Sequence, residues 1–370
     1  MIKLFFEGDL FFEQLKEDIR NAKDYIFIEF YIFQLEHIGK ELLQLLIKKN
    51  RNDKVTVKIL VDGIGSRDYV EDLFKLTKDT SIEVGVYKPF RFKFLFRSGY
   101  HRRNHRKLIL IDDRILYTGG MNIKDVMSKR IMGEHRWRDT MVRIENGYHV
   151  EIRRIFFQCK LDYIGLWRIT KRGFYFLPKL IPILNALKKN QRFIIFSSLN
   201  KKRRRLFRKF YYDFIDHSHN FLYIATPYFV PPIKLIRLLK QKAAQGVDVR
   251  ILTAGNTDVW LARQAGRAVY STLLKSGVKI YEFHNRVFHA KQTINENGLI
   301  IGSSNIDYRS FLHNLEIDIY LSTEEVLKNI LFQWQKDIEE SEQIHYKEWK
   351  RRGILEKITE KIAYGLRYYL

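Results

Sequence analysis

The stretch NHRKLILIDDRILYTGGMN, residues 104–122, is matched further along the chain by FHAKQTINENGLIIGSSN, residues 288–305. Each stretch has a His-x-Lys pair, then a β-rich run, and then a glycine-containing turn that ends in Asn. Fixed order at corresponding places is the mark of an internal repeat, so we interpret the chain as a duplication rather than a chance likeness.

The sequence around the two stretches repeats as well. Before the first, β-type runs at 25–33, 55–61 and 82–87 alternate with helical spacing at 39–49 and 70–78. Before the second, runs at 221–230, 247–253 and 278–283 alternate with helical spacing at 233–244 and 261–275. This alternation predicts the α/β class, with two similar α/β/α-layered halves related by pseudo-two-fold symmetry. Helical spacing from residue 324 and around 349–362 predicts two packing helices at the end.

The spacing within each stretch suits one shared site. A His and a Lys two positions apart on a strand project from the same face, and the turn can return its Asn to the same place. Lysine and asparagine side chains can bind the non-bridging oxygens of a phosphodiester, while one histidine attacks phosphorus and the other protonates the leaving oxygen. A single His-x-Lys pair usually lies on a solvent-exposed strand face and has no catalytic role. Two such pairs at corresponding places of a duplicated fold instead favour an active site. The residues concerned are His105, Lys107, Asn122, His289, Lys291 and Asn305.

Composition sets the class of protein. The chain has 370 residues, of which 46% are apolar, and this excludes a disordered chain. Its one cysteine, Cys159, excludes a disulfide framework and a cysteine-rich zinc site. No apolar stretch approaches the roughly 18 residues of a spanning helix. Glu7 and Asp9 argue against a signal peptide at the start. We therefore expect a soluble or peripheral intracellular protein.

The positive charge is concentrated between the two repeats. The formal net charge is +24, and residues 163–212 contribute 14 basic and no acidic residues to it. This predicts three parts: a first half at 1–162, a basic insert at 163–212, and a second half at 213–370. The insert mixes aromatic and aliphatic residues with its charges and ends in the run KKRRR at 201–205. We interpret it as a membrane-interface element for anionic lipid, the alternative being a solvated basic surface.

Both repeat stretches resemble the HKD motifs of the phospholipase D superfamily, and their flanks resemble the bacterial cardiolipin synthases. The similar stretches are IEFYIF (28–33), VDGIGS (61–66), NHRKLILID (104–112), YTGGMNI (117–123), WRDTMVRI (137–144), TPYFVPP (226–232) and GSSNIDYRSFLHNLEI (302–317). They follow the family's order and spacing over nearly the whole chain.

The resemblance implies a phospholipase D-like fold with one active site at the seam between the halves, working without a metal or other cofactor. It implies that His105 becomes a covalent phosphohistidine and that His289 acts as general acid and then general base, although the sequence alone does not distinguish the two. Lys107, Lys291, Asn122 and Asn305 would hold the phosphate, together with Gly120 and Ser304 of the turns. An acid after each motif would orient the histidine of that motif, and the candidates are Asp139 and Glu316.

The second motif departs from the family pattern. The first has its aspartate at Asp112, whereas the second has one residue fewer between lysine and glycine. Counting forward from Lys291 places the acid at Glu296, and counting back from Gly302 places Asn295 there. We expect Asp112 and Glu296 to belong to the catalytic set, with Asn295 as the alternative for the second.

Two functions follow from these observations. The first is a phosphatidyltransferase that joins two phosphatidylglycerol molecules into cardiolipin and releases glycerol. The second is a phosphodiesterase of the same superfamily that acts on nucleic acid or hydrolyses phospholipid. The flanking stretches and the apolar insert favour the first. We then expect no nucleic-acid partner, an anionic phospholipid membrane as the partner, and peripheral location at the cytoplasmic face of a bacterial cell membrane.

Overall fold

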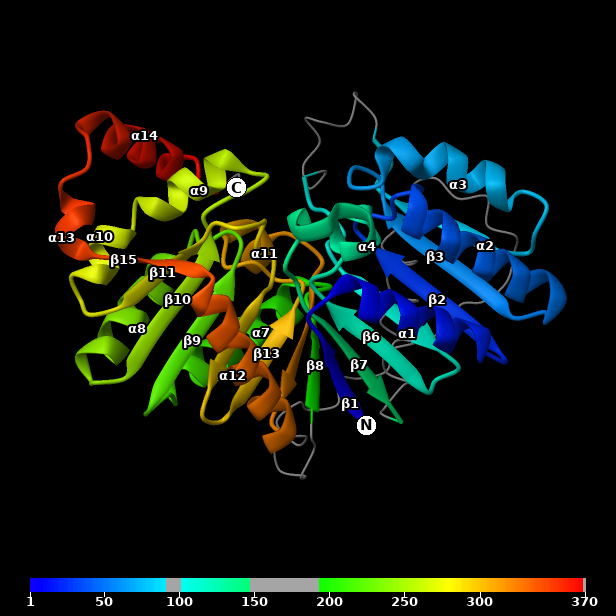
Figure 1. Cartoon of the computed structure of the whole chain (residues 1–370), viewed down its shortest axis with the longest axis horizontal. Coiled ribbons are helices and arrows are strands. Elements are labelled where there is room, and N and C mark those ends of the chain that lie inside the picture. Colours follow the sequence, from blue (N-terminus) through cyan, green and yellow to red (C-terminus); the bar gives the residue numbers. More distant parts are fainter. Residues whose placement is uncertain (91–100, 147–192, 369–370) are drawn as a thin grey trace.

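The chain is organised around two mixed β-sheets that lie side by side (Figure 1). The structure is a computed structural model, and it describes residues 1–90, 101–146 and 193–368. Helices cover the outer faces of the sheets, and apolar side chains of both sheets meet between them. The α/β class predicted from the alternating pattern is confirmed.

The first sheet contains seven strands in the order β1-β7-β6-β5-β2-β3-β4. Its strands are β1 (Ile2–Phe5), β2 (Tyr25–Phe30), β3 (Thr56–Asp62), β4 (Glu83–Tyr87), β5 (Lys107–Ile111), β6 (Ile115–Gly119) and β7 (Met141–Glu145). The accompanying helices are α1 (Gly8–Arg20), α2 (His37–Asn52), α3 (Val70–Thr77) and the short α4 (Lys129–Met132). Strands β2, β3 and β4 are parallel, and the other neighbours are antiparallel.

The second sheet contains eight strands in the order β15-β11-β10-β9-β12-β13-β14-β8. Its strands are β8 (Phe193–Ser197), β9 (Phe221–Thr226), β10 (Asp248–Ala254), β11 (Lys279–Phe283), β12 (Gln292–Asn295), β13 (Gly298–Gly302), β14 (Ile317–Leu321) and β15 (Ser341–Ile344). The helices are α7 (Lys201–Asp216), α8 (Ile233–Ala244), α9 (Trp260–Arg267), α10 (Tyr270–Leu274), α11 (Tyr308–Leu312), α12 (Glu324–Glu339), α13 (Tyr346–Lys350) and α14 (Ile354–Gly365).

The two sheets have the same topology, apart from the added edge strand β15. When the first sheet is followed from β4 and the second from β11, the strands correspond one to one, and β1 of the first sheet corresponds to β8 of the second. Helix α7 corresponds in the same way to α1, since each joins the outer antiparallel strand to the first parallel one.

This correspondence places residues 193–212 in the second half, although we predicted them as the end of the insert. The predicted boundary at 212/213 falls inside α7, and β8 pairs with β14. Within the KKRRR run, Arg204 is buried and donates from Nη1 to the carbonyl oxygen of Ser198 (3.1 Å), so it is part of the fold. The remaining insert residues, 163–192, lie outside the described residues.

Two predicted helices are each divided in the structure. The stretch predicted at 261–275 forms α9 and α10, with a break at Ala268–Val269. The stretch predicted around 349–362 forms α13 and α14, and Gly353 precedes α14 with an extended backbone (φ −59°, ψ 153°). Helical spacing does not reveal such breaks, because the residues on either side keep the same apolar period.

The seam between the halves is held by polar contacts as well as by packing. Arg138 of the first half makes two hydrogen bonds to the carboxylate of Asp337 on α12 (2.8 and 2.7 Å), and both side chains are buried. Backbone bridges also cross the seam, from Asn104 to Leu315 and from Arg138 to Phe288. These bridges lie next to His105 and His289, so the seam fixes the backbone at both predicted catalytic positions.

The helices of the described residues are too short or too polar to cross a membrane.

Candidate active site

Each motif histidine is anchored by the opposite half of the molecule. The backbone amide of His105 donates to the carbonyl oxygen of Leu315 (2.9 Å), and that of His289 donates to the carbonyl oxygen of Arg138 (2.7 Å). The seam therefore brings the two histidines to one place, as the duplicated motifs predict.

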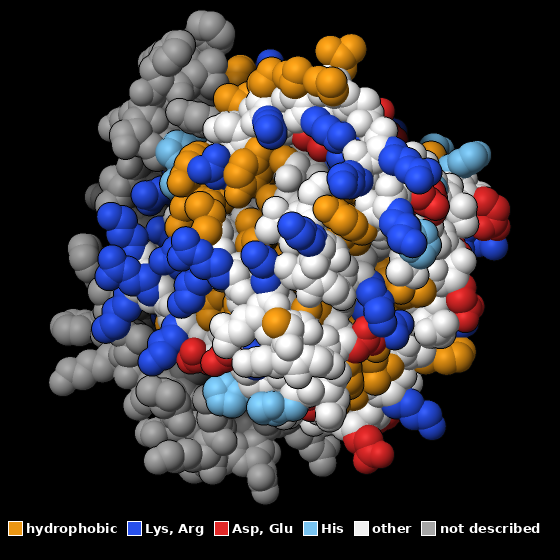
Figure 2. Space-filling view, turned by 90° about the vertical axis from the view of Figure 1, so that its left-hand side faces the viewer, with side chains coloured by type: hydrophobic (Ala, Val, Ile, Leu, Met, Phe, Trp, Pro, Cys, Tyr) orange, Lys and Arg blue, Asp and Glu red, His pale blue; other side chains and the backbone are white. Residues whose placement is uncertain are grey.

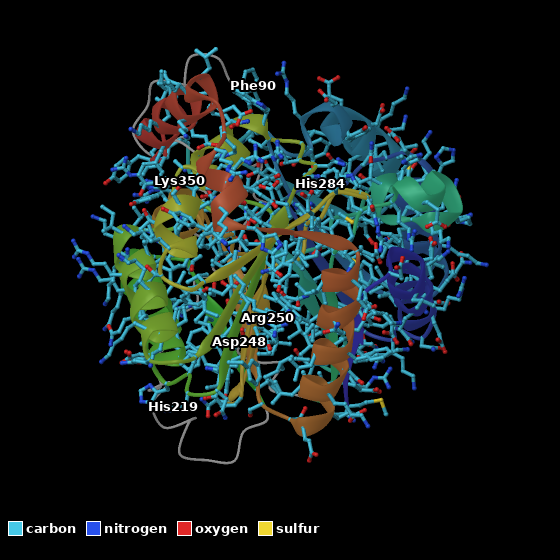
Figure 3. All side chains as sticks on the ribbon, turned by 60° about the vertical axis from the view of Figure 1, so that its left-hand side comes forward. Phe90, His219, Asp248, Arg250, His284 and Lys350 are labelled. Carbon is cyan, nitrogen blue, oxygen red and sulfur yellow. The ribbon has the colours of Figure 1, made fainter. Side chains whose placement is uncertain are left out.

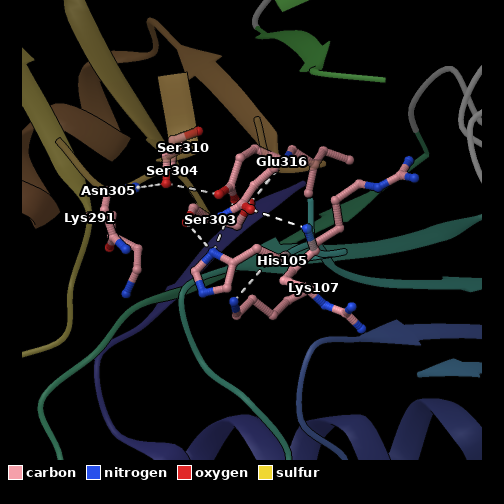
Figure 4. A network of polar contacts seen from close by, with 12 residues as sticks. His105, Lys107, Lys291, Ser303, Ser304, Asn305, Ser310 and Glu316 are labelled. Carbon is pink, nitrogen blue, oxygen red and sulfur yellow. Dashed lines mark hydrogen bonds and ion pairs between the residues drawn. The ribbon is translucent and has the colours of Figure 1, made fainter. Parts of the chain in front are cut away.

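The His105 ring is oriented by acceptors from the second half (Figure 4). Its Nδ1 lies 3.1 Å from Oε2 of Glu316 and 3.0 Å from the carbonyl oxygen of Ser303. Since both partners only accept, Nδ1 carries the proton and Nε2 keeps its lone pair. Glu316 is itself fixed by hydrogen bonds from the hydroxyls of Ser303 and Ser310. An unprotonated Nε2 is the form of imidazole that can attack phosphorus.

The His289 ring has a matching arrangement with an acceptor from the first half. Its Nδ1 lies 2.6 Å from Oδ2 of Asp139, and the other oxygen of Asp139 accepts from the amide of Thr140 (2.7 Å). Gly120 leaves room for this carboxylate, because a Cβ at that position would lie 2.1 Å from Asp139 Oδ1. Lys291 Nζ is 2.9 Å from the same Nδ1.

The acids are thus exchanged between the halves, which differs from our expectation. We predicted that Asp139 would orient the histidine of its own motif and that Glu316 would do the same. Asp139 lies two residues before β7 and Glu316 directly before β14, and the sheets meet at the seam through β6, β13 and β14. An acid at that position faces the histidine of the opposite half, so each histidine-acid pair needs both halves.

Burial keeps both histidines neutral. It lowers the pKa of His289 to about 4, with Lys291 adding to the effect, and it also lowers the pKa of His105, assisted by Lys107. Burial alone would raise the pKa of Asp139 and of Glu316, but the neighbouring cationic and imidazole groups hold both below the usual range. The site therefore combines neutral imidazoles with ionised carboxylates.

The two motif lysines lie behind their histidines. Lys107 Nζ donates to the carbonyl oxygen of His105 (2.8 Å), and Lys291 Nζ donates to that of His289. Burial, together with the charge of Lys291, lowers the pKa of Lys107 to about 7. Two buried ammonium groups near each other destabilise the free protein, and an anion between them would offset that cost.

We expect Lys107→Met to abolish turnover and to reduce the pH dependence of stability. In the unfolded chain this lysine binds a proton up to a pKa of about 10.5, but in the folded protein only up to about 7. The unfolded state therefore holds more protons between these values, and the free energy of unfolding of the wild-type protein rises with pH across that window.

Urea unfolding of both proteins at pH 7 and pH 9 measures this slope. Lys328→Met, at an exposed position on α12, is the matched control and should leave the slope unchanged. An equal slope in Lys107→Met and wild type would contradict the lowered pKa.

A pocket of about 270 Å³ opens in front of the histidines at the carboxyl ends of the parallel strands. Its walls include both histidines and both motif asparagines, and the buried Asn305 Oδ1 has no hydrogen-bond partner among the described residues. Asn122 Oδ1 accepts from the amide of Ile32 (3.2 Å), which leaves its NH₂ group as a donor. The other lining residues include Tyr31, Arg103, Lys124, Trp137, Tyr228, Asp258, Asp307 and Arg309.

Asp112 and Glu296 lie away from this pocket, contrary to our assignment of both to the catalytic set. Asp112 follows β5, so it is about 17 Å from Lys107 at a strand rise of ~3.4 Å per residue. Its carboxylate accepts from the backbone amides of residues 23, 24 and 25 at the start of β2 (2.7–2.9 Å).

Glu296 does the same at the start of β9, where it accepts from the amides of His219 and Asn220. Figure 3 shows His219 at the lower end of the molecule, below Asp248 at the start of β10. Glu296 is therefore the counterpart of Asp112, and both fasten the first parallel strand of their half. Asn295 instead donates to the carbonyl oxygen of Phe214 (2.9 Å).

Gly120 and Ser304 are also used inside the protein rather than toward the pocket. The Gly120 amide donates to the carbonyl oxygen of Thr140 (2.9 Å). The amide and hydroxyl of Ser304 both bind Asp318, whose pKa burial and the nearby Glu316 raise to about 8. These polar groups are therefore paired within the protein.

Our motif reasoning did not single out Tyr31 and Tyr228 of the pocket wall, whose rings lie against His105 and His289 respectively. They follow the corresponding strands β2 and β9, in the stretches IEFYIF and TPYFVPP. Aligning those two stretches as repeats would have identified them, since both place a tyrosine just after the strand.

The donor set of the site does not suit a metal. Among residues 1–90, 101–146 and 193–368, no three His, Cys, Asp or Glu side chains are grouped so that they could hold an ion.

Comparison with known proteins identifies the family of the chain. A family model described as "Cardiolipin synthase, PLD-like domain" matches residues 15–138 and 211–338, one match in each half. A cardiolipin synthase of Clostridium perfringens is 31% identical, over 98% of this chain and 75% of that protein. A cardiolipin synthase of Bacillus anthracis is also 31% identical, over 97% of this chain and 70% of that protein.

A solved structure supports the fold. The phosphatidylserine synthase of Haemophilus influenzae superposes with a TM-score of 0.71 at 17% identity, covering 100% of this chain and 95% of that one. With matches of this extent in both halves, the chain belongs to the cardiolipin synthase family of proteins with a phospholipase D-like domain.

Proposed function

We propose that this protein transfers the phosphatidyl group of one phosphatidylglycerol to the glycerol hydroxyl of a second, producing cardiolipin and free glycerol. The observation that carries the proposal is the pair of neutral histidines, each oriented by an acid of the opposite half, in one pocket with two asparagine side chains. The named activity of the relatives, at about 30% identity over nearly all of this chain, supports the choice of substrate.

In the first step, Nε2 of His105 attacks the phosphorus of the donor lipid. The phosphorus–oxygen bond to the glycerol headgroup breaks, and His289 gives its Nε2 proton to the departing glycerol oxygen. His289 takes up that proton when the substrate binds, because an anionic phosphate raises the low pKa of a neighbouring imidazole. The product of this step is a phosphatidyl group bonded to His105.

In the second step, the hydroxyl of another phosphatidylglycerol enters. His289, now neutral, removes the hydroxyl proton, the oxygen attacks phosphorus, and the nitrogen–phosphorus bond to His105 breaks. The protonated His289 and the free His105 are then ready for the next donor. Asp139 and Glu316 would stabilise the positive charge on each ring in turn.

The pocket walls contain groups for both parts of a glycerophosphate. Lys124 and Arg309 can bind phosphate oxygens, while the carboxylates of Asp258 and Asp307 can accept hydrogen bonds from glycerol hydroxyls. A nucleic-acid backbone carries charge but no such hydroxyl-rich headgroup. These acids therefore favour a polyol acceptor.

The substrate class also implies a place for the enzyme. Because phosphatidylglycerol is held in a bilayer, we propose peripheral association with an anionic membrane, at the cytoplasmic face of the bacterial cell membrane. The charge of the basic insert supports this association through attraction to anionic headgroups.

The test is an assay of purified protein with phosphatidylglycerol vesicles. We expect one glycerol released for each cardiolipin formed, measured by enzymatic glycerol detection and thin-layer chromatography. Phosphatidic acid in place of cardiolipin would indicate hydrolysis, and cleavage of DNA without lipid turnover would indicate a nuclease; either result would overturn the proposal.

A further inference from the structure

The C-terminal helix α14 turns its apolar side toward solvent. Leu355, Ile354 and Ile362 are 80%, 74% and 64% exposed, and Ile358 and Leu366 are exposed as well. At 100° per residue these positions lie within one stripe about 120° wide. We call these residues the α14 patch.

The side of α14 that faces the protein carries fewer apolar side chains, and Tyr364 there is partly buried against the core. Ala363 packs against the protein, and the buried Glu360 is paired with Arg352. An ordinary surface helix has the reverse arrangement, with its apolar stripe against the core. Exposed apolar stripes of this kind mark surfaces that bind a partner.

The α14 patch lies beside the mouth of the catalytic pocket. Helix α14 packs on α9, and Ala363 forms a small cluster with Ala265 and Val230, which lines the pocket. At the start of α9, Trp260 is 57% exposed and the neighbouring Val259 both lines the pocket and reaches solvent. Helix α14 thus packs on the helix that begins at Trp260, next to Val259 at the pocket rim.

Basic side chains lie next to the α14 patch. Figure 2 shows apolar side chains along the upper edge of this face, where α14 lies, with Lys and Arg just below them. Lys350, the last residue of α13, lies at this same end of the molecule (Figure 3). Over α13 and α14 the exposed charged residues are Lys347, Lys350, Arg351 and Lys361 against Glu348 and Glu356. The surface combines apolar groups with a positive excess.

We propose that the α14 patch and Trp260 dock this enzyme on an anionic phospholipid bilayer, with the pocket mouth facing the headgroups. A helix of 12 residues is about 18 Å long, so it lies in the interface rather than across the bilayer. Its apolar side chains enter the acyl boundary, Trp260 takes the interfacial position that tryptophan favours, and the basic side chains meet the phosphates. The proposal rests on the proposed function, since it explains how the site reaches a lipid.

The test compares the double variant Leu355→Glu/Ile362→Glu with a matched control, Leu10→Glu/Phe332→Glu. The control residues are each 65% exposed, on α1 and α12. Binding is measured by cosedimentation with vesicles of phosphatidylglycerol and of phosphatidylcholine. Turnover is measured on phosphatidylglycerol vesicles and on monomers of a short-chain phosphatidylglycerol in solution.

We expect the α14 variant to bind phosphatidylglycerol vesicles at least about tenfold more weakly, with vesicle turnover falling by a similar factor. Monomer turnover of this variant and every property of the control should match wild type. Unchanged vesicle binding would overturn the proposal, as would equal loss on monomers, which would mean that the patch supports the fold. If the wild-type protein bound phosphatidylglycerol and phosphatidylcholine vesicles equally, the claim that docking requires an anionic lipid would be wrong. If wild type releases no glycerol from either substrate but binding still depends on the patch, the proposed function fails and the docking surface stands.

Discussion

Replacing His105 or His289 with alanine is expected to lower phosphatidylglycerol turnover by at least about 10⁴-fold. When residues act as one catalytic unit, the loss of any one of them removes most of the rate enhancement. The structure makes them such a unit: they come from different halves, and both line the same pocket. His217→Ala, at an exposed position after α7, is the control and should retain wild-type turnover. Substantial activity in either motif variant would contradict the proposed mechanism.

A substrate that needs no general acid separates the two roles. With a nitrophenyl phosphodiester, the leaving group departs without a proton, so His289→Ala should still form the covalent bond to His105. We expect a burst of nitrophenol with slow further turnover in His289→Ala, and no burst in His105→Ala. Phosphorus NMR of the trapped protein would show the nitrogen–phosphorus bond. A burst in His105→Ala alone would reverse the assignment.

The fold could be predicted from the sequence because its signals are local and occur twice. Each strand of the parallel part is a short apolar run, and each crossover helix has its own periodicity. These local patterns allow the runs at 25–33 and 221–230 to be recognised as corresponding strands. The start of the second half was missed because its counterpart, β1, is only Ile2–Phe5, and so short a run carries little signal. The strand β8 and the first twelve residues of α7, 201–212, were therefore assigned to the insert.

The site could be predicted only in part, for a related reason. The two-residue spacing predicted that His105 and Lys107 lie close together, although β5 begins only at Lys107 and the contact is from Lys107 Nζ to the backbone carbonyl of His105. Which acid faces which histidine depends on how the sheets meet at the seam, and sequence order carries no information on that. The motif position of Asp112 suggested chemistry, although the length of β5 separates it from the pocket. Its role at the start of β2 appears only in three dimensions.

The exchange of acids between the halves leads to the second large expected effect. Asp139→Asn and Glu316→Gln should each reduce turnover by about 10²- to 10⁴-fold, because an amide no longer holds the proton on Nδ1 of the histidine or stabilises the charged ring. The charge and the hydrogen bond of Asp139 raise the pKa of His289, so the loss of this carboxylate should move that pKa further below about 4.

The two variants should act on opposite histidines, which separates the crossed arrangement from a general loss of structure. Nitrogen-15 spectra of the imidazoles should show that Asp139→Asn changes the tautomer of His289 and leaves His105 unaltered. Glu316→Gln should do the reverse, because its Oε2 is 3.1 Å from Nδ1 of His105, which belongs to the other half. If each acid affected the histidine of its own half, the halves would be independent catalytic units. The crossed result instead makes neither half competent without the other, so the duplicated fold carries one active site rather than two.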